Sequence, residues 1–239
     1  MNLSEIRDMF SELSGRLDLV TVDANGVYKA DWYITAGSRL LDRLADVSNS
    51  EATAFFAAQA GSFHLSVPDV RSILRVYYYT STSRAELRKG TQDLLRRLFS
   101  DPLTTENRGV PKYYIPVSFR VGSPRSAATP GDFMQHVDFT GTAIDGIMFP
   151  PIDTDGTFEV FGYYYSKSLV NDTDTNYWAR HHPMLLAWAA LYHLEVSYRN
   201  TSGAQDWMNS IGTTLRTIEF DHVLEVSTEI KQMGGREND

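Results

Sequence analysis

The stretch that decides the fold is FEVFGYYYSKSLVNDTDTNYWARHHPMLLAWAALYHLEVSYRNTSGAQDW, residues 158–207. It holds, in order, an aromatic strand, a polar loop, a nearly all-apolar helix and the start of a second helix. Residues 184–192 are apolar at every position, which predicts a helix buried on all its faces. This order provides packing surfaces but no obvious nucleophile, phosphate loop or metal cage. It therefore indicates a role in assembly rather than in catalysis.

The strand and the loop at the start of this stretch carry signals of their own. Successive strand side chains point to opposite faces, so residues 158–165 present aromatic rings on both faces. This predicts burial on two sides, within the fold or against a neighbouring subunit. After the loop, Asp174 or Thr175 can cap a helix. Pro183 then either kinks that helix or begins its main part.

Helices are also predicted toward both ends of the chain. Residues 200–203, NTSG, predict a turn into a helix whose apolar stripe is Trp207, Ile211, Leu215 and Ile218. Near the N-terminus, apolar residues recur every three or four positions, which predicts an amphipathic helix capped by Asn2 or Ser4 and ended by Gly15. Its expected stripe is Leu3, Ile6, Phe10, Leu13 and Leu17. A second N-terminal helix is predicted over 32–46.

The middle of the chain has the two-residue period of strands. Strands are predicted over 73–80, 113–121, 133–139 and 144–152. Asp153-Thr154-Asp155-Gly156 predicts a hairpin turn into strand 158–165. Ser83 and Glu86 have the spacing of a capping box, so one helix is predicted over 83–99. Residues 122–131, GSPRSAATPG, are small and polar, which predicts a long exposed loop.

The expected fold class is α+β: a helical bundle built from N- and C-terminal helices with an inserted antiparallel β-rich region. We expect residues 1–50 to form the N-terminal helical part of this bundle. Residues 51–170 are the expected β-rich insertion, including the helix over 83–99. Residues 171–239 are the expected C-terminal helical hairpin and tail, packing with residues 1–50.

Composition and charge argue against several classes of protein. The chain of 239 residues has a formal net charge of −8 and scattered basic residues, which does not fit sequence-specific nucleic-acid binding. It has no cysteine, so disulfides and thiolate metal sites are excluded. The apolar run 184–192 is shorter than the roughly 20 residues of a membrane span. Glu5, Asp8 and Glu12 do not fit a signal peptide.

No motif predicts a catalytic, cofactor-binding or metal-binding site. His181 and His182 are adjacent, and adjacent helical residues point about 100° apart, so they cannot easily share one ion. Asp153 and Asp155 begin like a calcium loop, but its twelfth position is Tyr164 instead of Glu. HExxH, G-x-S-x-G and glycine-rich phosphate loops are absent. We therefore expect a protein that is not an enzyme and has no cofactor.

The stretch quoted first resembles the head-to-tail adaptor (connector) proteins of tailed bacteriophages. In that family a Tyr-rich strand precedes an Asn/Asp/Thr loop, and an aromatic residue, a proline, a Leu/Ala/Tyr-rich helix and a tryptophan follow. The corresponding positions here are 161–165, 171–176, Trp178, Pro183, 185–192 and Trp207. A looser agreement extends over the N-terminal helix, the β-rich middle and the helical C-terminal tail.

The resemblance implies a virion structural protein of the neck, assembled in the host cytoplasm and without catalysis. It implies a homo-oligomeric ring of twelve copies that binds beneath the portal, receives tail or nozzle proteins and lets DNA pass without sequence-specific binding. In this family the C-terminal arm commonly contacts the portal. The candidate portal contacts here are Phe220, Val223, Leu224, Ile230 and Met233. The candidates for a subunit or tail contact are Ser123, Pro124, Arg125 and Pro130.

Two alternatives stay open at the level of the sequence. One is a different virion part, such as a tail-completion or nozzle protein. The other is a hydrolase of cell-wall glycans, which would need a cleft with perturbed carboxylates. The tyrosine runs 77–79 and 163–165 could line a carbohydrate platform, but strand residues alternate between faces, so a core and a subunit interface explain them better.

Overall fold

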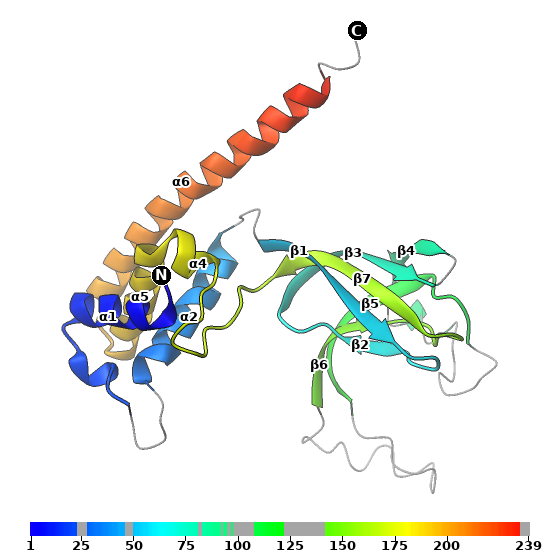
Figure 1. The fold of residues 1–239 in the computed structure, drawn as a ribbon, viewed down its shortest axis with the longest axis horizontal. Coiled ribbons are helices and arrows are strands. Elements are labelled where there is room, and N and C mark those ends of the chain that lie inside the picture. Colours follow the sequence, from blue (N-terminus) through cyan, green and yellow to red (C-terminus); the bar gives the residue numbers. More distant parts are fainter. Residues whose placement is uncertain are drawn as a thin grey trace, which may run out of the picture. The chain divides into compact units, whose positions relative to one another are not determined.

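The structure is a computed structural model that describes residues 1–22, 28–45, 50–80, 83–91, 93–94, 97, 108–121 and 142–234. For residues 118–121, 142–145, 219 and 221–234 it describes the backbone alone. The chain divides into a helical unit, Met1–Ser50 with Tyr165–Asp239, and a sheet unit, Glu51–Tyr164 (Figure 1). The N- and C-terminal helices pack together and the strands lie between them in the sequence, which confirms the predicted α+β class.

The helical unit consists of α1 (Leu3–Ser14), the 3-10 turn η1 (Leu17–Leu19), α2 (Lys29–Leu44), α4 (Tyr177–His181), α5 (Pro183–Ser197) and α6 (Thr201–Gly234). Of the two predicted caps, Asn2 is the one that caps α1, through a capping box with Glu5. Gly15 ends the helix, as predicted, at a φ of 65°. Pro183 is the first residue of α5, so it begins this helix instead of kinking it.

Helix α5 lies at the centre of the helical core, and α1, α2 and α6 pack against it. Its buried residues are Leu185, Leu186, Ala187, Ala189, Ala190, Leu191 and Leu194, which confirms the helix predicted to be buried. The predicted stripe of α6 is confirmed at Ile211 and Leu215, which are buried. The stripe of α1 was wrong beyond Phe10: Leu17 is 73% exposed because α1 ends at Ser14, so the helical period does not reach it.

Close approach of α2 and α5 depends on one glycine. A Cβ atom at Gly37 of α2 would lie 2.8 Å from the backbone nitrogen of Ala190 and 2.9 Å from the carbonyl carbon of Ala189. Real side chains do not approach a backbone this closely, so the two helices touch through Gly37 on one side and small alanines on the other. Among the helices of the described residues, none is long and apolar enough to cross a membrane.

Over its described residues, the sheet unit is one seven-stranded, mostly antiparallel sheet that is nearly a barrel. Its strands are β1 (Glu51–Ala58), β2 (His64–Ser66), β3 (Val70–Tyr79), β4 (Arg84–Lys89), β5 (Tyr113–Val121), β6 (Thr142–Met148) and β7 (Gly156–Tyr164). Their order is β1-β7-β3-β4-β5-β6-β2, and only the β4/β5 pair is parallel. Phe158 and Val160 of β7 and Tyr78 of β3 are buried in its core.

Two predictions about this sheet were wrong. The helix expected over 83–99 is replaced over its first part by strand β4, in which Ala85 and Leu87 face inward and alternate with exposed Arg84, Glu86 and Arg88. Thr80 and Ser83 close a turn instead of a capping box, since each backbone N–H bonds to the other residue. In the later part of the range 83–99, the described residues Asp93, Leu94 and Arg97 are helical, which agrees with the prediction there. Residues 92, 95, 96, 98 and 99 lie outside the described residues, as does the strand expected over 133–139.

The second error is the hairpin expected at Asp153–Gly156. The strands on either side of it, β6 and β7, do not pair with each other. Strand β6 pairs with β5 and β2, whereas β7 lies between β1 and β3. The turn residues therefore connect two separate parts of the sheet, and the turn signal alone could not distinguish this connection from a hairpin.

Candidate functional site

The polar loop after β7, residues 165–176, is fixed by a buried carboxylate of α2. Asp42 is 3% exposed and accepts three hydrogen bonds. The Trp178 indole Nε1 donates to it at 2.7 Å, the Ser166 backbone N–H at 2.9 Å and the Ser166 hydroxyl at 2.6 Å. Hydrogen bonds to an ionised group are stronger than neutral ones. One side chain thus holds together the start of the loop, helix α4 and helix α2.

A second buried charge joins the same loop to α1. The Arg7 guanidinium donates to both carboxylate oxygens of Asp31, at 2.5 and 2.8 Å, and to Asp172 of the loop at 2.5 Å. Its Cζ atom lies 3.9 Å from the centre of the Tyr28 ring. A bidentate guanidinium contact fixes orientation as well as distance. Arg7 therefore sets the position of α1 against α2 and against the loop.

Asp174 organises the loop itself. Its Oδ2 accepts the backbone N–H groups of Val170 and Asn171 at 3.0 and 2.9 Å, and its Oδ1 accepts the Lys167 ammonium at 3.1 Å. The bonds from Asn171, Val170 and Lys167 lower the pKa of Asp174 below its ordinary value of 3.8. Because its carboxylate is used in this way, Asp174 does not cap α4, and the prediction that Asp174 or Thr175 would do so was wrong. Asn176 is the cap, and its side chain accepts the N–H of Ala179.

The loop backbone also serves the first turn of α1. The Leu3 and Ser4 N–H groups, which have no partner within the helix, donate to the carbonyls of Asp174 and Asp172 at 2.9 and 3.2 Å. The loop is therefore held at both ends and in the middle. Its exposed side chains, such as Val170, are presented on a fixed backbone, which is a useful property for a contact surface.

The residues predicted to contact a portal lie on α6. Among the described side chains of α6, Leu215 is the last that is buried in the core of the helical unit, and Ile218 is partly buried against this core. Phe220, two residues later, is 62% exposed. The positions of Val223, Leu224, Ile230 and Met233 fall within the helical backbone of α6, where side chains are not described. The loop candidates Ser123, Pro124, Arg125 and Pro130 lie outside the described residues.

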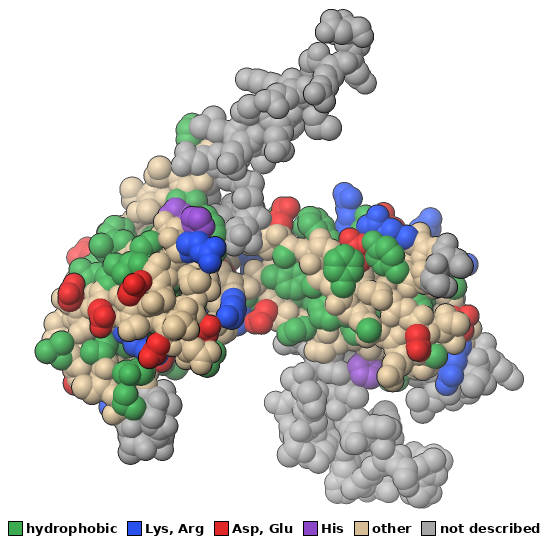
Figure 2. All heavy atoms as spheres, viewed as in Figure 1, with side chains coloured by type: hydrophobic (Ala, Val, Ile, Leu, Met, Phe, Trp, Pro, Cys, Tyr) green, Lys and Arg blue, Asp and Glu red, His purple; other side chains and the backbone are tan. Residues whose placement is uncertain are grey.

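The outer face of the sheet unit carries a group of exposed and half-buried aromatic and charged side chains. We call Phe55, Tyr77, Tyr79, Arg84 and Glu159 the aromatic–arginine patch. Its members come from four neighbouring strands, β1, β3, β4 and β7. The Arg84 Cζ atom lies 4.1 Å from the centre of the Tyr77 ring and 5.2 Å from that of Tyr79. Figure 2 shows hydrophobic, basic and acidic side chains side by side on the visible face of this unit.

The patch is ordered by its own contacts. Arg84 donates to the Glu159 carboxylate at 2.9 Å, and the Tyr79 hydroxyl donates to the same oxygen. The rings of Phe55 and Tyr79 have centroids 6.4 Å apart. Tyr78, between Tyr77 and Tyr79, points into the core. The sequence predicted aromatic rings on both faces of a strand, but it did not show which rings from different strands would meet.

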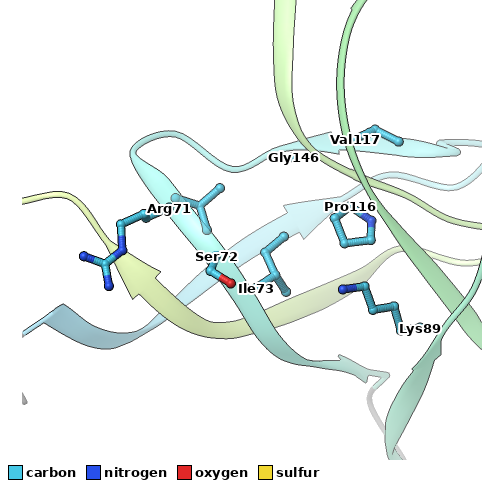
Figure 3. Close-up of a pocket in the computed structure, with 8 residues that line it drawn as sticks. Arg71, Ser72, Ile73, Lys89, Pro116, Val117 and Gly146 are labelled. Carbon is cyan, nitrogen blue, oxygen red and sulfur yellow. The ribbon is translucent and has the colours of Figure 1, made fainter. Parts of the chain in front are cut away.

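A shallow cleft of about 380 Å³ lies elsewhere on the sheet unit. Figure 3 shows it between β3, the end of β4 and strands β5 and β6. Its lining residues are Val70, Arg71, Ser72, Ile73, Lys89, Pro116, Val117 and Gly146. None of them is a carboxylate, whereas glycan hydrolysis uses a pair of carboxyl groups. In Figure 3 the Arg71 guanidinium also points away from Lys89, so the two cations do not converge on one position.

The histidines do not form a metal site within the described residues. No group of three or more His, Asp or Glu side chains there could hold a metal ion. The rings of His181 and His182 have centroids 6.5 Å apart, and both rings pack against Tyr177. Burial, and the neighbouring His181, lower the pKa of His182. These contacts give the pair a packing role at the junction of α4 and α5.

Comparison with known proteins assigns the chain to a family. Residues 1–224 match the family described as SU10 adaptor protein, which covers both units and all but the last part of α6. No curated protein matches the chain. The family match agrees with the order of strand, loop and helices in residues 158–207 and with the packing of the terminal helices. The chain therefore belongs to the SU10 adaptor protein family, a family of phage head-to-tail adaptors.

Proposed function

We propose that this adaptor forms a closed ring of twelve copies in the neck of the virion, beneath the portal. The ring extends the DNA channel and provides the attachment site for tail or nozzle proteins. Its role is structural, with no catalytic step, and it assembles in the host cytoplasm before joining the particle. The observation that carries this proposal is the family match over residues 1–224. Closed rings of identical subunits need head-to-tail interfaces, in which two different surfaces of the chain meet.

The C-terminal half of α6 is the proposed portal contact. Helix α6 spans 34 residues, and Leu215 is the last of its described side chains to be buried in the helical core, while the helical backbone continues to Gly234 (Figure 1). The proposed contact residues are Phe220, Val223, Leu224, Ile230 and Met233. Covering the exposed apolar ring of Phe220 with a partner protein is favourable, because it removes apolar surface from water. Amphipathic helices commonly bind in apolar grooves of other proteins.

The charge of the chain supports passage of DNA without binding. The net charge of −8 repels a phosphate backbone, whereas DNA-binding proteins gather Lys and Arg on one surface. The second proposed contact is the segment 122–131, with Ser123, Pro124, Arg125 and Pro130 touching a neighbouring subunit or a tail protein. It is proposed from the small and polar character of this sequence.

Light scattering of the purified protein, alone and mixed with the portal of the same phage, tests the proposal. We expect a complex with the stoichiometry of a ring when portal is present. A chain ending at Ile218 keeps the described core of the helical unit and should fold but not bind portal. Phe220→Lys should weaken portal binding by about tenfold or more, as for a contact at the centre of an interface. Val170→Lys, at a side chain 71% exposed in the fixed loop, is the matched control.

Two results would decide against the proposal. If the protein does not bind portal at any concentration tested, it is not a portal-binding ring. If it instead captures tail proteins in the absence of portal, it is the tail-completion or nozzle component considered as an alternative. If the chain ending at Ile218 binds portal as well as the full chain does, the proposed ring would still stand. The portal contact would then lie outside the part of α6 that follows Ile218.

A further inference from the structure

The helical unit is built from two separate pieces of the chain. Its core joins α1 and α2 of the N-terminal piece to α4, α5 and α6 of the C-terminal piece. The core of the sheet unit is drawn from residues 51–164 alone. Among the described residues, the two cores therefore share no member. The chain passes from one unit to the other at two crossing points, between Ser50 and Glu51 and between Tyr164 and Tyr165.

The two crossing points lie next to each other at one end of a strand pair. Strand β1 begins at the first crossing point and β7 ends at the second. The two strands form one antiparallel ladder, which runs without a break from the Glu51–Tyr163 pair to the Ala58–Gly156 pair (Figure 1). Directly paired residues of antiparallel strands have Cα atoms about 4.5–5.5 Å apart. The Tyr163 hydroxyl also donates to the Glu51 carboxylate at 3.2 Å, so side chains reinforce the pair nearest the crossing points.

The C-terminal piece is fixed to α2 directly after its crossing point. The backbone N–H and the hydroxyl of Ser166 both donate to the buried carboxylate of Asp42. The Nε of Arg43 donates to the Tyr165 hydroxyl at 3.2 Å, and the Arg39 Cζ atom lies 4.4 Å from the centre of the Tyr165 ring. The contacts on α2 thus begin at the residue that follows β7.

Holding two points of a chain together removes the entropy cost of closing the loop between them. If the sheet unit unfolded, residues 51–164 would become one long flexible loop, and the helical unit would have to close that loop by itself. A disulfide that closes a loop of this length stabilises a protein for the same reason. The coupling is reciprocal, because two linked equilibria shift each other by the same free energy. It acts through the chain itself.

We infer that the β1–β7 ladder is a non-covalent cross-link of the helical unit, through which the folded insertion keeps α1 and α2 packed on α5. The insertion thereby stabilises the unit that carries α6, whatever contacts it makes with other virion proteins. This role belongs to the free chain, so it does not depend on the proposed ring or on portal.

Denaturant unfolding of the full chain tests this role. Val76→Asp and, where it is not sufficient, Phe158→Asp place an unpaired charge at side chains that are fully buried in the core of the sheet unit, and should unfold that unit. Hydrogen exchange of peptides from β3 and β7 checks that it has unfolded. Tryptophan fluorescence reports on the helical unit alone, since this unit holds all four tryptophans of the chain, Trp32, Trp178, Trp188 and Trp207. We expect the equilibrium constant for unfolding of the helical unit to rise by about a hundredfold or more.

An engineered disulfide separates closure of the loop from every other effect of the sheet. The chain has no cysteine, so Glu51→Cys with Tyr163→Cys allows a single intramolecular disulfide, between two residues that are paired in the ladder. In the Val76→Asp chain, oxidation should recover most of the lost stability of the helical unit, and reduction should remove it again. The matched control is Tyr77→Cys with Glu86→Cys, a pair of β3 and β4 that closes only a short segment. Its oxidation should recover little.

Two results would overturn this role. In the first, the helical unit of the Val76→Asp chain keeps its wild-type stability although the sheet unit is unfolded. In the second, stability is lost but oxidation of the Glu51→Cys, Tyr163→Cys chain recovers none of it. The same disulfide decides the case of a Val76→Asp chain that folds in neither unit, since a folded helical unit after oxidation supports the cross-link and an unfolded one contradicts it. No portal is present in these measurements, so a failure of the proposed function would leave their results unchanged.

Discussion

The indole Nε1 of Trp178 donates a 2.7 Å hydrogen bond to Oδ1 of Asp42, although the two residues are 136 positions apart. Asp42 belongs to α2, near the N-terminus, and Trp178 belongs to α4, after the sheet unit. The bond therefore joins the two parts of the sequence that the β-rich insertion separates. The helical unit is made of two chain segments, Met1–Ser50 and Tyr165–Asp239, and this bond connects them within one core.

Replacing Asp42 tests this connection. Asp42→Ala leaves the Trp178 N–H and the Ser166 donors buried without their acceptor, so we expect a loss of about 2–4 kcal/mol in the free energy of unfolding. Asp42→Asn keeps one acceptor oxygen, so its loss in the free energy of unfolding should be smaller than that of Asp42→Ala. Denaturant unfolding followed by tryptophan fluorescence measures both. The control is Asp8→Ala at an exposed position of α1, which should change the free energy by about 0.5 kcal/mol or less. Equal losses for Asp8→Ala and Asp42→Ala would contradict the role given to Asp42.

A methyl group at Gly37 should separate α2 from α5. The added Cβ would lie 2.8 Å from the Ala190 nitrogen, so one helix must shift. We expect Gly37→Ala to destabilise the protein by about 1–3 kcal/mol, although alanine favours helices by roughly 1 kcal/mol over glycine. Gly212→Ala is the matched control, since nothing lies within 4 Å of a Cβ placed there on α6. It should stabilise the protein by about 0.5–1 kcal/mol. Thermal melts that show the same sign for both variants would contradict close packing at Gly37.

Asp174 should make the stability of the helical unit sensitive to acid. Its pKa is lower in the folded protein than its ordinary value of 3.8, so the unfolded chain binds the proton more readily. The stabilisation is therefore fully present above the ordinary pKa and is lost as the pH falls below it. The difference in melting temperature between wild type and Asp174→Asn should be largest near neutral pH and shrink toward about pH 2. A difference that stays constant over this range would show that Asp174 acts without its charge.

His193 should give a second pH dependence, in a higher range. Burial lowers its pKa below the ordinary 6.5, against a backbone hydrogen bond with Ala36 that raises it. The neutral form is thus favoured in the folded state, so its contribution is present above pH 6.5 and is lost as the pH falls. We expect His193→Gln to flatten the decline in melting temperature between about pH 7.5 and pH 5.5. The wild-type slope of melting temperature against pH is the reference, and an unchanged slope in His193→Gln would rule His193 out.

Local signals in the sequence were reliable where one segment carries all the information. The cap of α1 by Asn2 or Ser4 and its end at Gly15 depend on neighbouring residues, and the structure confirms Asn2 as the cap and Gly15 as the end. Helix α5 was predictable because an all-apolar helix can be stable only when other elements surround it. The capping-box spacing of Ser83 and Glu86 failed, because pairing of β4 with β3 buries Leu87 and outweighs a local preference.

The sequence by itself determined the α+β class and the helical elements at both ends, since these follow from periodicity within short segments. It also carried the family resemblance, through the order of residue types in 158–207. Only the tertiary structure decided that Asp42 meets Trp178, that Arg7 meets both Asp31 and Asp172, and that β7 lies between β1 and β3 instead of beside β6. The aromatic–arginine patch and the place of β1 at one end of the strand order belong to this second group. Their reason is physical: strand order and buried charge contacts join residues far apart in the chain, and no local pattern specifies which distant partner each one finds.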